Sequence, residues 1–192
     1  MPQKYHIEAL YLIFHFLSKN PKKILVMETS VPSVDESIFN LNTDWEDLYG
    51  DVVEEEPHLI PETLGRTVYV EYFVDTYHSG NFITRHPHSG ILLFINNDLM
   101  KSFIKRKNTV ESITFGSELV ALRISRNMIV EIRIKLKLFG VNFGDTENVL
   151  CYNNGVVNST SIPESTLSKK HNAINYHCVY EASAYGILRV RK

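Results

Sequence analysis

Two carboxylates in the sequence occupy positions suited to binding a divalent cation. Asp75 comes directly after residues 67–74, an alternating run of β-branched and aromatic side chains, and Glu118 lies early in a run with helical periodicity. An acid at the end of a strand and an acid at the start of a helix can converge on one site, where carboxylate-bound cations assist phosphodiester hydrolysis. Because such placements are also common without a metal, a purely structural role for both residues stays open.

Histidines are the next candidates for metal ligands. His86 and His88 have the His-x-His spacing that suits a metal bound to a strand, and His78 lies close by. The sequence offers them no Cys or His partner at the spacing of structural zinc sites, which favours ordinary loop histidines. His171 and His177 are six residues apart, whereas two ligands on one helical face are four apart. Packing or a phosphate contact is therefore the preferred role for this pair.

The two cysteines, Cys151 and Cys178, are too few for a disulfide framework and indicate a reducing intracellular compartment, cytoplasmic or nuclear. Cys151 and His177 could in principle form a nucleophile pair, but no activating signature accompanies them. Residues 7–17 are apolar, yet two polar residues interrupt them and no cleavage site follows. We therefore expect a packing helix there, and neither a secretion signal nor a membrane anchor.

Basic residues in two places could contact a phosphate backbone. One group surrounds the aromatic Phe103, and the other opens a second helical region, where a helix N-terminus would add partial positive charge. The candidate nucleic-acid-binding residues are Lys101, Lys105, Arg106, Lys107, Lys169, Lys170 and His171. Runs of charge are more often simply solvated surface, so both interpretations are kept.

Hydrophobic periodicity predicts the elements that must position these residues. Apolar runs that alternate or are short and continuous predict strands, and recurrence every three to four residues predicts helices. The expected strands cover residues 67–74, 90–96, 101–104, 148–152 and 187–190, and the expected helices cover residues 7–17, 114–139 and 163–185. Residues 96–98 predict a hairpin turn, and Gly140 a helix C-cap. This order predicts an α/β domain with a helical N-terminal appendage.

Composition limits the class of protein. The 192 residues, 44% of them hydrophobic and with a net charge of −2, suffice for one domain with a core and exclude disorder for most of the chain. With 9 glycines and no persistent heptad, collagen-like and coiled-coil classes are excluded too. Acids and prolines dominate residues 35–62, which predicts a solvated linker with one short turn around residues 45–49.

Short fragments of the sequence carry a resemblance to a known family. Each is weak alone, but their order is specific: FVDTYHSG at 73–80 followed by TRHPHSG at 84–90, KRKNTV at 105–110, FGSELVAL at 115–122, CYNN at 151–154, and the Lys-His and Tyr-His pairs at 170–171 and 176–177. Together they make residues 67–192 similar to the ribonuclease H domain of copia-type retrotransposon Pol polyproteins. Residues 6–26 resemble the end of the reverse transcriptase in the same polyprotein.

The resemblance implies a fold, a domain division and a reaction. The fold would be a ribonuclease H-like mixed sheet flanked by helices. The chain would divide into a reverse-transcriptase remnant (1–30), an acidic linker (31–64) and a ribonuclease H-like domain (65–192) truncated at its C-terminus. The implied reaction is hydrolysis of RNA in RNA–DNA hybrids with Mg²⁺ or Mn²⁺, for which Asp75 and Glu118 would be catalytic metal ligands. The implied partners are an RNA–DNA hybrid and the remainder of the Pol polyprotein, and no membrane.

Departures from the family pattern predict that catalysis is lost. Tyr77 stands where the family has a second Asp, Tyr152 occupies the position of its third metal carboxylate, and its last Asp would lie beyond Lys192. A phenol is uncharged at neutral pH and cannot replace a carboxylate on a hard cation. Asp145 and Glu147 are poor substitutes, because they lie toward the far end of the strand from the expected site.

Three interpretations of function follow from these matches and departures. The chain is a residual metal-dependent nuclease, a non-catalytic module that binds nucleic acid or a protein partner, or a decaying copy without function. The departures favour the second and third interpretations. Hybrid binding, if retained, should weaken steeply with salt and show little sequence preference. A Gly-rich phosphate loop and a dinucleotide fingerprint are both lacking from the sequence, so no organic cofactor is expected.

Overall fold

The structure is a computed structural model of the 192-residue chain. It describes residues 4–21, 30, 45–50, 54, 56–77, 88–106, 114–167 and 172–192. Several residues singled out from the sequence lie outside these ranges: His78, His86, Lys107, Lys169, Lys170 and His171. No helix within the described ranges is long and apolar enough to cross a membrane.

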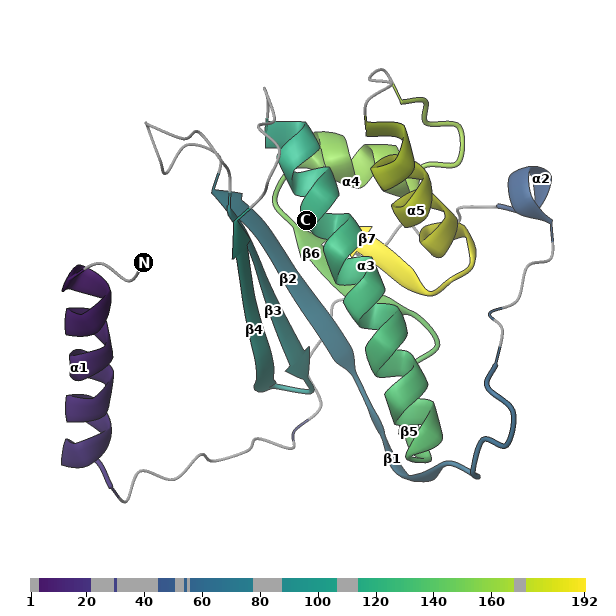
Figure 1. The fold of residues 1–192 in the computed structure, drawn as a ribbon. Coiled ribbons are helices and arrows are strands. Elements are labelled where there is room, and N and C mark those ends of the chain that lie inside the picture. The colour runs from purple at the N-terminus through teal and green to yellow at the C-terminus, as the bar shows by residue number, and fades with distance from the viewer. Residues whose placement is uncertain are drawn as a thin grey trace.

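A mixed sheet of five strands forms the centre of the fold (Figure 1). The helices are α1 (Lys4–Lys19), α2 (Glu46–Tyr49), α3 (Thr114–Leu138), α4 (Asn154–Ser161) and α5 (Ala173–Ala184). The strands are β1 (Leu64–Val68), β2 (Val70–Tyr77), β3 (His88–Ile95), β4 (Asp98–Arg106), β5 (Val141–Phe143), β6 (Glu147–Cys151) and β7 (Leu188–Arg191). The order is β4-β3-β2-β6-β7, antiparallel from β4 to β2 and parallel from β2 to β7. The expected α/β class, a mixed sheet with helices and a helical N-terminal appendage, is confirmed.

Within the described residues, the helices cover one face of this sheet and leave the other open. Tyr72 and Val74 of β2 are buried in one cluster with Leu119 and Leu122 of α3. Figure 1 shows α4 and α5 beside α3 on the same side of the sheet, where they contact β7. Because side chains alternate along a strand, Phe73 and its neighbours in register emerge on the opposite face. We call this surface the open face.

The strand expected at residues 67–74 is in fact two strands with a break at Tyr69. The backbone N–H of Tyr69 donates to Asn96 Oδ1 at 3.0 Å, and the N–H of Asn96 donates to the Tyr69 carbonyl at 2.7 Å. Asn96 has a φ of +55° in the predicted β3–β4 turn, a conformation that Asn tolerates better than most residues. β1 therefore leaves the main sheet and pairs in parallel with β5.

The long helix expected at residues 114–139 is confirmed as α3, and its C-terminal end is closed at Gly140. The N–H of Gly140 donates to the Lys137 carbonyl at 3.0 Å, and Gly140 has a φ of +66°. Glycine adopts this conformation without steric cost, and a Cβ here would also lie 3.0 Å from the Glu62 carbonyl oxygen. The chain therefore reverses tightly from α3 into β5.

The second helical region, expected over residues 163–185, is wrong over residues 163–167 and confirmed over α5. Residues 163–167 are not helical, and α5 begins at Ala173. A helix that the sequence did not predict, α4, lies earlier, where Asn153 Oδ1 accepts a hydrogen bond from the Gly155 N–H at 3.0 Å. Asn is a strong N-cap residue, so the Asn-Asn-Gly sequence interpreted as a strand boundary is in fact a helix start.

Candidate functional site

Asp75 lies near the point where the parallel half of the sheet ends. The sequence placed it at the end of a strand, but β2 continues to Tyr77 in antiparallel pairing with β3, and Asp75 is opposite Gly90. On the other side of β2, the last parallel pair is Val74 with Cys151. Asp75 therefore follows that last pair directly and is exposed, with its Oδ1 accepting the Thr76 N–H at 2.7 Å.

Glu118 reaches the same end of the sheet from α3. The helix starts at Thr114, so Glu118 lies one turn inside it, and only 7% of the residue is exposed. Its Oε2 accepts a hydrogen bond from Cys151 Sγ at 3.3 Å. A buried carboxylate normally has a cationic or strong hydrogen-bond partner, because removing its charge from water is costly. A thiol is a weak donor, so it compensates that cost only slightly.

Cys151 lies beside Glu118, a contact that the sequence did not predict. Burial raises the pKa of the Cys151 thiol to about 12, and the charges of Glu118 and Asp75 act in the same direction. A nucleophilic cysteine needs a lowered pKa, so the pairing with His177 considered from the sequence is wrong. His177 is exposed on α5, with its ring centroid 5.2 Å from that of Tyr176.

Tyr152, which stands at the family's third carboxylate position, is 78% exposed. It follows Cys151 at the end of β6, and Lys192 Nζ lies 5.3 Å from the centroid of its ring. This cation–π contact binds an ammonium group where the family pattern calls for a metal ligand. Position 152 thus attracts the amine of a lysine and supplies no negative charge.

The residues present do not fit a two-metal centre. Among the described residues, no group of three His, Cys, Asp or Glu side chains could hold a metal ion. Cys151 stays a neutral thiol at physiological pH because of its raised pKa. His88, from the histidine group considered for zinc, is paired in register with Arg106 on the β3–β4 hairpin. Within the part of the chain that the structure describes, Asp75 and Glu118 therefore lack the further ligands that a hard cation requires.

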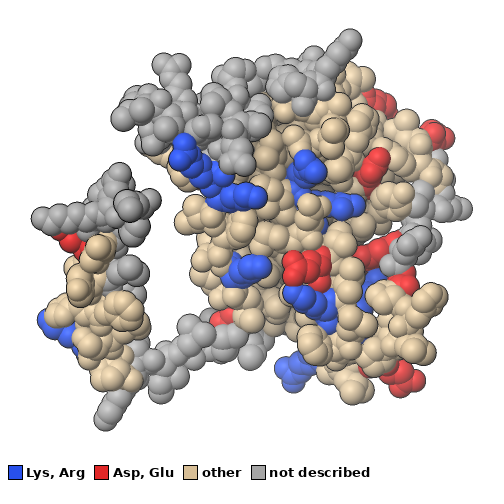
Figure 2. Space-filling view, viewed as in Figure 1, with Lys and Arg blue, Asp and Glu red and all other residues tan. Residues whose placement is uncertain are grey.

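Of the basic residues considered for phosphate contacts, Lys101, Lys105 and Arg106 are described. All three are exposed on β4, the edge strand of the sheet, and Lys105 and Arg106 lie near its end, opposite Ser89 and His88 of β3. On the helix-covered side, Figure 2 shows Lys and Arg interleaved with Asp and Glu. This side therefore has no uniform positive field, and phosphate contacts are better served by the β4 edge.

Comparison with known proteins finds similarity at the level of structure. No protein-family model and no curated protein matches the chain. Among solved structures, the N-terminal RNase H domain of rv2228c from Mycobacterium tuberculosis, determined as a fusion with maltose-binding protein, is similar, with 12% identity and a TM-score of 0.49. The match covers 66% of this chain and 81% of that chain. A similarity of this size does not indicate a function. The α/β fold class follows from the strand order and helix placement described above.

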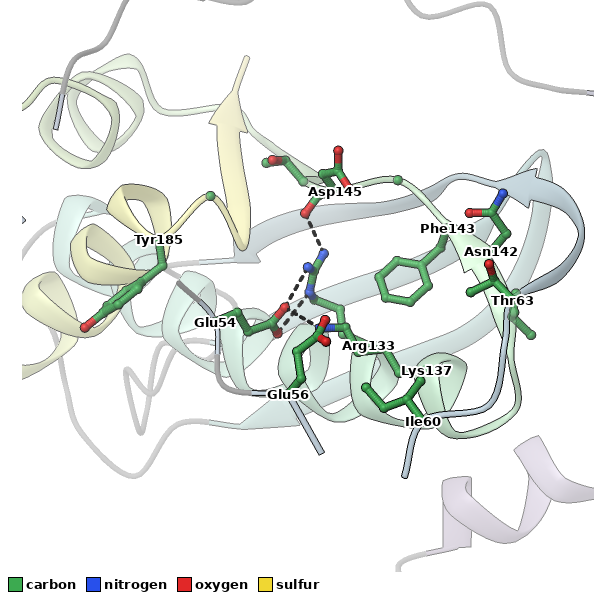
Figure 3. Close-up of a pocket in the computed structure, with 14 residues that line it drawn as sticks. Glu54, Glu56, Ile60, Thr63, Arg133, Lys137, Asn142, Phe143, Asp145 and Tyr185 are labelled. Carbon is green, nitrogen blue, oxygen red and sulfur yellow. Dashed lines mark hydrogen bonds and ion pairs between the residues drawn. The ribbon is translucent and has the colours of Figure 1, made fainter. Parts of the chain in front are cut away.

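A second cluster of charged groups lies at the opposite end of α3 and lines a cavity of about 610 Å³ (Figure 3). Arg133 donates to Glu54 Oε2 at 2.8 Å and to Glu147 Oε1 at 3.1 Å, and Lys137 donates to Glu54 Oε2 at 2.9 Å. Arg133 is only 5% exposed and Glu147 only 1%. Paired in this way, these groups satisfy one another.

Two pKa shifts in this cluster have opposite directions. Burial acts to raise the pKa of Glu54, but hydrogen bonds from Arg133 and Lys137 outweigh it, so the pKa is lowered from its ordinary value. Burial raises the pKa of Glu147 to about 8, although Arg133 acts against it. Glu54 is thus stabilised as a carboxylate, whereas burial disfavours the charged form of Glu147, and the contact with Arg133 offsets this only in part.

The acidic segment expected to be a solvated linker is partly attached to the domain. Trp45 lies edge-on to Tyr180 of α5 with ring centroids 4.8 Å apart, and Tyr49 lies 6.0 Å from the same ring. Glu54 then pairs with α3 as described above. The expected turn at residues 45–49 is confirmed as α2, but the expectation of a merely solvated connector is wrong for these residues. The aromatic residues within this acidic run were the sequence feature from which the attachment could have been predicted.

Proposed function

We propose that this chain is a ribonuclease H-like domain of copia-type retrotransposon Pol origin that binds RNA–DNA hybrids and does not hydrolyse them. The ordered sequence fragments support the family. The mixed sheet with α3 across it supports the fold that the resemblance implies. The remainder of a Pol polyprotein would be its natural partner.

The observation that carries the loss of hydrolysis is the composition of the site between β2, β6 and α3. Glu118 Oε2 accepts a hydrogen bond from Cys151, and the charge of Asp75 also acts to raise the pKa of that thiol, so both acids lie near the end of β6. The third position is an exposed phenol held beside an ammonium group. With too few anionic ligands, a cation pair that activates water and stabilises the leaving oxygen cannot be held.

Binding of the hybrid can be retained after hydrolysis is lost, because binding uses basic side chains and hydrolysis uses the carboxylates. Lys105 and Arg106 are exposed on an edge strand, where they can contact phosphates without rearrangement of the core. Lys107 and residues 169–171 are the further contacts that the family resemblance implies. Phosphate contacts neutralise charge and release counterions, so the affinity should fall as salt is raised.

The first experiment measures cleavage of a labelled RNA–DNA hybrid with Mg²⁺ or Mn²⁺. We expect the parent chain to be folded and inactive. Tyr152→Asp and Tyr152→Asn should be compared, because only the first restores a carboxylate in a similar volume. Cleavage by Tyr152→Asp alone would assign the loss to this position. Cleavage by the parent that disappears in Asp75→Asn would overturn the proposal.

The second experiment measures hybrid binding over a range of salt concentrations. Lys105→Gln should weaken binding to all sequences alike and lower the slope of log affinity against log salt by about 1. Lys135→Gln is the matched control, because Lys135 is exposed on α3 on the other side of the sheet, paired with Glu131. A folded parent that fails to bind the hybrid would leave the partner-binding or functionless interpretation instead.

A further inference from the structure

The geometry points to an intramolecular interface: we infer that α1 docks with its apolar side on the open face of the five-stranded sheet. The proposed docking surface is the apolar part of that face, which lies on β4, β3 and β2 and on the adjoining strand β6. Its apolar residues are Phe73, Leu92, Phe94, Leu99, Ile104 and Leu150. Asp75, Tyr152 and Lys192 of the candidate site border this part of the face, but the apolar contacts of α1 do not require nucleic-acid binding.

The open face has the character of a surface that is normally covered. The register places Phe73 between Leu92 of β3 and Leu150 of β6, and Ile104 of β4 opposite Gly90. The missing side chain of Gly90 leaves room there, and a hollow of about 470 Å³ lies over these strands. Ile104 is 78% exposed, far above what an isoleucine has in a covered sheet.

The polar part of the open face, at the β6–β7 side, limits the area that α1 can cover. At the β6–β7 side, Arg191 pairs with Glu71 at 3.1 Å, and Arg189 donates to Asn148 at 2.6 Å. Glu71 and Asn148 are already buried under these arginines and bonded to them. An apolar helix is therefore directed to the β4 side.

α1 has the matching property, because most of its circumference is apolar. Ile7, Tyr11, Leu12, Phe14, Phe16 and Leu17 are each 48% to 70% exposed. Among the side chains of α1 that the structure describes, Glu8, His15 and Lys19 fall on one narrow stripe at helical period. A helix that is apolar nearly all round is stable in water only when it is buried against a partner. Figure 1 shows α1 standing apart from the sheet.

The chain itself keeps α1 close to the open face. Asn97, in the β3–β4 turn, donates to Ser30 Oγ at 2.6 Å and to the Ser30 carbonyl at 3.2 Å. Ser30 is 11 residues beyond the end of α1 at Lys19, a length of chain that can span up to about 36–40 Å. The 16-residue helix is about 24 Å long, and five strands span about 19 Å between the outermost strand axes. α1 can therefore reach the face and cover its apolar half.

Other occupants of the open face are less well supported. Base stacking by a single-stranded nucleic acid needs flat, accessible rings, whereas Phe73 and Phe94 meet at 71° with centroids 5.3 Å apart. A second copy of the chain would have to displace a helix that is tethered at high local concentration. Both occupants remain distinguishable outcomes of the test.

Paramagnetic broadening of methyl signals in the full chain tests the interface. A spin label is placed at Ser18→Cys in a Cys178→Ser background, since Cys151 is buried. We expect broadening of Leu92, Ile104 and Leu150 that is at least several-fold stronger than that of Val179 on the helix-covered side. Uniformly weak broadening would overturn the inference. Broadening that appears only when labelled and isotope-enriched chains are mixed would assign the face to a second copy instead.

Matched substitutions separate docking from a general change in the fold. Tyr11→Asp with Phe14→Asp should abolish the broadening, and so should Ile104→Asp, which changes an exposed residue that the core does not need. Ile174→Asp is the control, because Ile174 is 70% exposed on α5 and should leave the broadening unchanged. Broadening that survives the α1 or Ile104 substitutions, or loss that occurs equally in the control, would overturn the inference. A single-stranded oligonucleotide that displaces α1 at low salt would assign the face to nucleic acid.

Discussion

At the N-terminal end of α3, Glu118 is buried and its hydrogen-bond partner is a neutral thiol, with Asp75 as a second acid close by. At the C-terminal end, Glu54 and Glu147 are matched by Arg133 and Lys137 within 3.1 Å. The same helix therefore carries one group of carboxylates without cations and one with them. The helix dipole favours this arrangement, since cations are stabilised near its C-terminal end.

This difference separates residues that hold the fold from residues that are available for function. Paired charges at the C-terminal end fasten the segment around Glu54 to α3 and β6, and removing one partner leaves another buried without compensation. At the N-terminal end, Glu118 is buried with a thiol as its hydrogen-bond partner, whereas Asp75 is exposed to solvent. No described cation pairs with either acid, so these two residues are candidates for a functional role rather than for holding the fold.

The largest expected effect comes from Arg133→Met. It leaves Glu147, which is 1% exposed, without its cation, and should lower the free energy of unfolding by about 3–5 kcal/mol. Because burial already raises the pKa of Glu147 to about 8, the folded state of the variant should prefer the protonated acid. Its stability should therefore fall further as the pH rises from 6 to 8.5, measured by chemical denaturation.

Arg123→Met is the control for that substitution. Arg123 is an exposed arginine on the same helix that donates to Asn175 at 3.1 Å, so its loss should cost about 0.5 kcal/mol or less. Equal losses in the two variants would remove the distinction between a buried ion-pair cluster and the rest of the helix surface.

An intermediate effect is expected from Glu54→Gln, about 1.5 kcal/mol near pH 7, because charge-assisted hydrogen bonds from Arg133 and Lys137 are lost. The pKa of Glu54 is lowered in the folded state, so its contribution is present above its ordinary value of 4.5 and is lost as the pH falls through the folded pKa. The difference between parent and variant should therefore shrink below pH 4.5 in acid denaturation. The pKa of Glu131 is lowered by its hydrogen bond with Lys135, but the pair is exposed and screened by solvent, so Glu131→Gln should show a much weaker dependence.

The smallest effect is expected from Glu118→Gln at the other end of α3. The amide still accepts the hydrogen bond from Cys151, and one of two neighbouring negative charges is removed. We expect the free energy of unfolding to change by about 0.5 kcal/mol or less, in the stabilising direction. A loss as large as that of Glu54→Gln, measured by the same denaturation, would mean that Glu118 holds the fold and that the two ends are alike.

Local patterns were sufficient to predict the strands and the long helix. Alternation along β2 and β3 and the 3.6-residue recurrence along α3 arise from contacts between near neighbours and a single buried face. The break at Tyr69 was not predictable, because it depends on hydrogen bonds to Asn96, which lies 27 residues away. α4 was missed because its sequence is polar and its start depends on the cap at Asn153.

Of the candidate site, the sequence by itself predicted that Asp75 and Glu118 have the chemistry of metal ligands, and that Tyr152 does not. Only the tertiary structure decided that Cys151 donates to Glu118 and that Glu54 pairs with Arg133, 79 residues away. The physical reason is that periodicity records which face of an element is buried. The identity of the group on the other side of that buried face depends on how distant segments are brought together.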